Sequence, residues 1–68
     1  MKISIKINNL NKSTDVTTIR NILTNEEGIV ACEISKAKKE VQIVYDNLTI
    51  SSEDIINLIE MAGYMIES

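Results

Sequence analysis

The sequence has no histidine, one cysteine (Cys32) and two aromatic residues, both tyrosines. Catalysis usually needs a histidine, a nucleophile paired with a base, or two carboxylates that converge, and the sequence indicates none of these. We therefore expect that the protein is not an enzyme. A lone cysteine excludes a disulfide within the chain and is typical of a reducing compartment, so we expect a cytoplasmic location.

The sequence also lacks a long hydrophobic run, and it opens directly into an alternating pattern, so we expect neither a signal peptide nor a membrane span. Its net charge of −3 argues against binding to nucleic acid. A nucleic-acid module would stack bases on outward-facing aromatic residues. Here Tyr45 falls on the inward face of its predicted strand, and Tyr64 is at the start of the last predicted strand. We expect no nucleic-acid partner.

The first half of the chain predicts a strand followed by a helix. Residues 2–8 alternate between polar and apolar side chains, which places Ile3, Ile5 and Ile7 on a buried face. An amphipathic helix is predicted after them, with apolar residues at helical spacing: Val16, Ile19, Ile22 and Leu23. Its N-terminus is expected to be capped by Ser13, Thr14 or Asp15.

The second half predicts a hairpin, a helix and a short final strand. Strands at 29–35 and 40–46 flank the basic turn Lys36–Lys39, with inward residues Val30, Cys32, Ile34, Val41, Ile43 and Tyr45. Ser51 and Asp54 form a capping pattern for the second helix, whose apolar face runs from Ile55 to Ala62. Gly63 is expected to end that helix in a left-handed conformation, before a strand at 64–67.

This order of elements, β-α-β-β-α-β, predicts an α+β fold. It is the ferredoxin-like sandwich, in which a four-stranded antiparallel sheet carries two helices on one face. With 68 residues and no linker or repeat, the chain is expected to form one domain, residues 1–68. The fold by itself does not specify a function.

Several motifs resemble the heavy-metal-associated domain of copper chaperones and of metal-transporting P-type ATPases. The similarity covers essentially the whole chain. It rests on four segments: Gly28-Ile29-x-x-Cys32-x-Ile34, Val41-x-Ile43-x-Tyr45-Asp46, Ile55 to Ile59, and Ala62-Gly63-Tyr64. The resemblance implies a Cu(I) or other soft-metal site on the loop after the first strand, with a tyrosine at the position of Tyr64 nearby.

The family's metal motif, Gly-Met-x-Cys-x-x-Cys, is absent from this sequence. Its glycine corresponds to Asn9 and its methionine to Leu10, while its two cysteines correspond to Lys12 and Asp15. Soft ions need thiolates, whereas lysine carries an ammonium without a lone pair and aspartate is a hard ligand. We therefore expect no cofactor and no tight metal binding. Leu10 is expected to keep the packing beneath the loop.

Other residues with ligand chemistry have simpler interpretations. Cys32 is expected to be a buried core residue, and Met61 and Met65 are expected to pack rather than to supply thioether ligands. Nothing in the sequence brings Glu26 and Glu27 to the same loop as Asp15, so a hard-cation site is not expected. The lysines of the turn at 36–39 are expected to be solvated.

Three functions remain possible: the resemblance implies two of them, and the topology permits the third. The chain is either a copper-chaperone-like domain that has lost its thiolates and kept protein docking, or a metal-handling protein with weak or partner-supplied ligands. A small-molecule regulatory domain is the third possibility, although the first loop has no glycine to admit a ligand. The resemblance implies a partner, either a metal-transporting P-type ATPase domain or another copy of the chain. It would be met by Leu10, Asn11, Lys12, Ser13, Asp15 and Tyr64.

Overall fold

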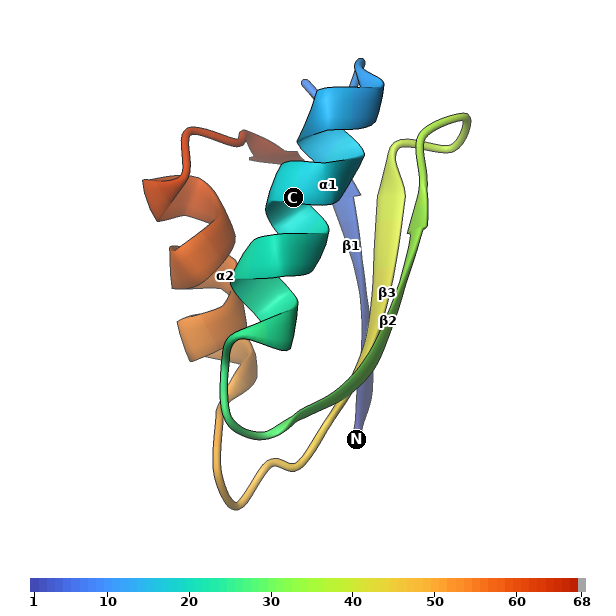
Figure 1. Ribbon diagram of the computed structural model, residues 1–68. Helices are drawn as coiled ribbons and strands as arrows, with labels where there is room; N and C mark the ends of the chain where they lie inside the picture. Colours follow the sequence, from blue (N-terminus) through green and yellow to red (C-terminus); the bar gives the residue numbers. More distant parts are fainter. Residues whose placement is uncertain (68) are drawn as a thin grey trace.

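The computed structural model describes residues 1–67 and contains one sheet and two helices (Figure 1). The elements follow the order β1 (Lys2–Ile7), α1 (Ser13–Thr24), β2 (Ile29–Ser35), β3 (Glu40–Tyr45), α2 (Ser52–Met61) and β4 (Ile66–Glu67). In the sheet the strands lie in the order β2-β3-β1-β4, and every neighbouring pair is antiparallel. Both helices lie on the same face of the sheet (Figure 1). The predicted ferredoxin-like α+β fold is confirmed.

The core lies between the inner face of the sheet and the two helices. The fully or almost fully buried side chains are Ile5, Ile7, Leu10, Ile19, Leu23, Val41, Ile43, Tyr45, Ile50, Ile55 and Ile59. Those on β1 and β3 occur at every second position, and those on each helix are four residues apart, as one buried face of a strand or helix requires. The periodicity of the sequence therefore predicted most of the core correctly.

A β-bulge changes the predicted pattern at the start of β2. Ile29 lies opposite Tyr45 and Ala31 lies opposite Val44, so that Val30 is an extra residue without a partner. Its side chain is 70% exposed, and the prediction that Val30 faces the core is wrong. Because a bulge shifts the alternation by one residue, Ile29 takes the inward position instead. Cys32 and Ile34 keep their predicted inward positions and pack, partly buried, against the core.

The helix ends agree with the sequence in part. The Ser51 hydroxyl accepts a hydrogen bond from the Asp54 N–H (3.1 Å), and the Asp54 carboxylate accepts one from the Ser51 N–H (3.2 Å), which confirms the predicted cap of α2. Gly63 has φ +96°, the predicted left-handed stop. Ala62, however, is the exposed C-terminal cap of α2, so its placement on the apolar face was wrong.

Neither helix of the described residues 1–67 combines the length and the apolar character that a membrane span requires.

Candidate functional site

The loop between β1 and α1 lies beside the segment that joins α2 to β4, and hydrogen bonds connect the two. The side-chain amide of Asn9 donates to the Gly63 carbonyl (3.2 Å) and accepts from the Met65 N–H (2.9 Å). The Asn8 N–H donates to the Met65 carbonyl (2.8 Å). The side-chain amide of Asn9 thus donates one hydrogen bond and accepts another, as a backbone peptide group would. The loop is therefore held in place without the glycine that the family motif has at position 9.

The carboxylate of Asp15 closes the loop from the other side. It accepts hydrogen bonds from the backbone N–H groups of Lys12 (2.9 Å) and Asn11 (3.1 Å) and from the hydroxyl of Tyr64 (3.0 Å). The two backbone donors, with a smaller contribution from Tyr64, lower the pKa of Asp15 below its ordinary value of 3.8. Since α1 begins at Ser13, Asp15 stands in its first turn and satisfies donors just ahead of the helix. Neither Ser13 nor Thr14 is the N-terminal cap; that position belongs to Lys12.

Tyr64 joins the C-terminal segment to the start of α1. Burial of the phenol raises its pKa above the ordinary value of 10.0, and the hydrogen bond to the Asp15 carboxylate raises it further. Both effects favour the neutral hydroxyl, which is the form that donates to the carboxylate. The pair connects residues 49 positions apart in the sequence. Tyr64 thus lies beside the loop, where the resemblance expected it.

The two positions that carry cysteines in the family are adjacent to each other at the N-terminus of α1. Lys12 is exposed and contributes an ammonium group, which has no lone pair for a metal. Asp15 contributes a carboxylate that already accepts three hydrogen bonds. Within residues 1–67 no three groups among the cysteine, aspartate and glutamate side chains are placed to hold a metal ion. The donor set of this loop does not fit Cu(I) or another soft ion.

The predicted contact residues divide into an exposed set and a buried anchor. Asn11, Lys12 and Ser13 are exposed, and Asp15 and Tyr64 are partly buried. Leu10 is completely buried, so its side chain cannot meet a partner, and its inclusion in the contact set needs correction. It packs into the core directly beneath the loop. We use the term loop face below for Asn11, Lys12, Ser13, Asp15 and Tyr64.

The methionines differ from their prediction. Met61 is 86% exposed and Met65 is 63% exposed, so neither is a packing residue. Met61 is the last residue of α2, beyond the helix positions that reach the core. Met65 precedes Ile66, which packs against the core, and alternation turns the neighbouring side chain outward.

The glutamates and the basic turn complete the set of sequence candidates. Glu26 and Glu27 follow the C-terminus of α1, whereas Asp15 is at its N-terminus, so they form no common site. The lysines of the turn at 36–39 are exposed, as predicted. Lys39 also contacts the first loop, because its Nζ donates to the Asn8 carbonyl (3.2 Å) and its carbonyl accepts from the Ile7 N–H (2.8 Å). No local signal in the sequence identifies this contact, since the turn and the loop are distant in the chain.

Comparison with known proteins adds a fold relationship to this geometry. No family model matches the chain, and no curated protein matches its sequence. Solved structures do match. A chain of the Atx1-Cu(I)-Ccc2a complex, in which Ccc2a is a yeast copper transporter domain, is 27% identical with a TM-score of 0.87; the alignment covers 97% of this chain and 90% of that one.

Two further structures extend the relationship. A copper-binding domain from HMA7, a P-type ATPase, is 23% identical with a TM-score of 0.90, covering 97% of this chain and 89% of that one. A putative copper-ion-binding protein from Bacillus anthracis is 18% identical with a TM-score of 0.93, covering 98% of this chain and 94% of that one. The chain has the heavy-metal-associated fold. The resemblance inferred from the sequence is confirmed for this copper-chaperone-like domain, which has a single cysteine, outside the loop.

Proposed function

We propose that this heavy-metal-associated domain is a non-catalytic docking module that has lost tight metal binding. Its loop face meets the corresponding face of another such domain, either one belonging to a metal-transporting P-type ATPase or a second copy of the chain. We place this activity in the cytoplasm, in keeping with a single free cysteine. In this proposal the domain keeps its contact with a partner protein, although its loop no longer has thiolate ligands.

The observation that carries the proposal is the hydrogen bonding of Asp15. In a thiolate site the metal ion itself links the two ligand positions, whereas here the carboxylate links Asn11, Lys12 and Tyr64. The loop is thus pre-organised by the protein, which lowers the cost of ordering it on binding. The side chains of Asn11 and Lys12 stay exposed and available for contact.

A second candidate function, metal handling with partner-supplied ligands, is favoured by one observation. Met65 is 63% exposed, and its backbone pairs with Asn8 and Asn9 of the loop. Its thioether is a soft sulfur beside the loop face. Together with thiolates of a partner domain it would form a shared Cu(I) site.

Competition for Cu(I) separates the two functions. The purified chain, titrated against a strong Cu(I) chelator under anaerobic conditions, should bind the ion no more tightly than about micromolar, because a tight soft-metal site needs at least two sulfur ligands held together. The Met65→Leu variant is the control and should behave like the parent chain. Tight one-to-one retention by the chain alone would contradict the first function. Under the second function, a mixture of the chain with a copper-binding P-type ATPase domain should retain Cu(I) more tightly than that domain alone, and the Met65→Leu variant should lose this gain.

Docking is tested by NMR titration of the labelled chain with the copper-binding domain of a P-type ATPase, in the absence of metal. The amide signals of Asn11 and Ser13 should shift on binding. Lys12→Glu should weaken binding, while Lys36→Glu makes the same charge change on the exposed β2–β3 turn and should affect binding less. Shifts confined to the sheet, or equal effects of the two substitutions, would contradict docking through the loop face.

A further inference from the structure

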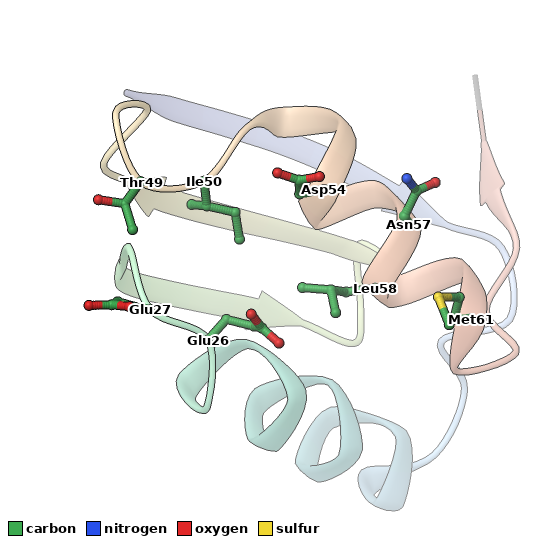
Figure 2. Close-up of a pocket in the computed structure, with 8 residues that line it drawn as sticks. All are labelled: Glu26, Glu27, Thr49, Ile50, Asp54, Asn57, Leu58 and Met61. Atoms are coloured by element: carbon green, nitrogen blue, oxygen red, sulfur yellow. The ribbon is translucent and has the colours of Figure 1, made fainter.

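A second surface feature lies away from the loop face, in a groove between α2 and the two loops that follow α1 and precede α2. Its volume is about 460 Å³, and it is lined by Glu26, Glu27, Thr49, Ile50, Asp54, Asn57, Leu58 and Met61. In Figure 2, Glu26 and Leu58 point toward one another, Glu26 from the loop after α1 and Leu58 from α2. The volume is within the range of about 300–1,000 Å³ that is typical of ligand sites. No residue of the loop face lines it.

The groove combines an apolar surface with an acidic rim. Ile50 is 6% exposed, Leu58 is partly buried, and Met61 presents an almost fully exposed thioether side chain at one end. Methionine is unbranched and polarizable, and it adapts to different partner surfaces. Glu26, Glu27 and Asp54 supply the carboxylates, and no lysine or arginine lines the groove.

Acidic and basic residues occupy largely separate segments of the chain, and this separation increases the negative charge around the groove. Residues 21–35 and 40–68 contain no lysine or arginine, and they hold every acidic residue except Asp15. The seven basic residues lie in the remaining segments: Lys2 and Lys6 in β1, Lys12 just before α1, Arg20 in α1, and the three lysines of the turn at 36–39. The groove is built entirely from the acidic segments. A concave surface lined by one sign of charge concentrates ligands of the opposite sign.

We propose that this groove binds a short basic segment of a partner protein, in which lysine or arginine residues flank an apolar side chain. The apolar side chain packs against Leu58 and Met61, and the cations face Glu26 and Glu27. A metal ion is not the occupant, because the carboxylates do not converge into a cation-binding group within residues 1–67. The surface is distinct from the loop face, so the two contacts are independent.

The probe for this proposal is the acetylated, amidated pentapeptide Lys-Leu-Arg-Leu-Lys, titrated into the labelled chain and followed by NMR. The backbone signals of Asn57, Leu58 and Met61 should shift, while those of Lys12 and Ser13 stay in place. A peptide with serine in place of both leucines, and free spermine, should each bind at least several-fold more weakly. Equal binding of either would overturn the proposal, because it would show that charge alone is recognised.

Two matched double variants test the rim. Glu26→Gln with Glu27→Gln should weaken peptide binding about threefold to tenfold, which is the effect expected when two exposed ion pairs are lost. Glu53→Gln with Glu60→Gln changes the net charge equally, on exposed residues of α2 outside the groove, and should have less than about a twofold effect. Equal losses in the two variants would overturn the proposal. Met61→Gln should also weaken binding.

The behaviour of the chain alone supplies a further test. Sedimentation at several concentrations should give the same result with and without the Glu26 and Glu27 substitutions, whether or not a second copy binds at the loop face. Salt-dependent self-association that these substitutions abolish would identify the basic turn of a second copy as the occupant and overturn the proposal. Circular dichroism should show the same fold for every variant, since all of the substituted residues are outside the core. Failure of the loop-face titration would leave these results unchanged.

Discussion

Leu10 connects the stability of the fold with the shape of the loop, and Leu10→Ala tests that connection. The side chain is completely buried within the core cluster, directly ahead of the exposed loop residues. Truncating a buried leucine costs about 2–5 kcal/mol, the sum of lost apolar transfer and the cavity that remains. A domain of this length has a free energy of unfolding of about 3–10 kcal/mol. The substitution should therefore remove a large part of the stability.

Urea denaturation followed by circular dichroism measures the loss. The midpoint should fall sharply with little change in the m-value, and the melting temperature should fall by at least about 8 °C, since 1 kcal/mol corresponds to about 4–8 °C in a domain of this size. Leu48→Ala is the matched control, because Leu48 is 93% exposed and its truncation should change stability by less than about 0.5 kcal/mol. Leu10→Met, which restores the residue of the family motif, should cost less than about 1.5 kcal/mol.

The loop should respond to the same substitution. In Leu10→Ala the amide signals of Asn11 and Lys12 should broaden or move. The N–H groups of these two residues donate to the Asp15 carboxylate, and that geometry depends on the buried Leu10 side chain holding the loop in place. A loss of stability no larger than that of Leu48→Ala would show that Leu10 does not anchor the loop. The interpretation of the loop face as a preformed surface would then be wrong.

Three further predictions concern the cysteine and the closed loop. Cys32 should react with a thiol reagent more slowly in the native protein than in denaturant, and Cys32→Val should be almost neutral, whereas equal rates would contradict its inward position on β2. Lys12→Cys with Asp15→Cys should raise Cu(I) affinity by several orders of magnitude, because thiols at a helix N-terminus ionise readily; a folded double variant that binds no better than the parent would show that the loop has diverged in shape. Because the pKa of Asp15 is lower in the folded state, its carboxylate stabilises the fold fully at pH values above its ordinary pKa of 3.8, and this contribution is lost as the pH falls through the folded-state pKa. The difference in unfolding free energy between the parent and Asp15→Asn should therefore shrink over that pH range. A difference that stays constant in acid denaturation would contradict the hydrogen bonding of this carboxylate.

The sequence by itself determined the order of elements, the inward faces of β1 and β3, and both helices. These features depend on periodicity and on local caps, such as the pairing of Ser51 with Asp54 and the left-handed Gly63, which act over a few residues. The absence of the cysteine pair is also a property of the sequence alone. That positions 12 and 15 carry lysine and aspartate, and so no thiolate, is therefore known without the tertiary structure.

Tertiary structure alone decided how the loop is held and which surfaces remain free. The bulge at Val30 depends on the pairing of β2 with β3, and alternation within one strand cannot reveal an extra residue. The three donors to Asp15 include Tyr64, which is 49 residues away, and Asn9 pairs with a segment more than 50 residues away. The acidic groove beside the exposed Met61 arises where α2 meets two loops that are distant from each other in the sequence. Contacts between distant segments depend on how the helices and strands pack together, and local patterns of residues do not predict that packing.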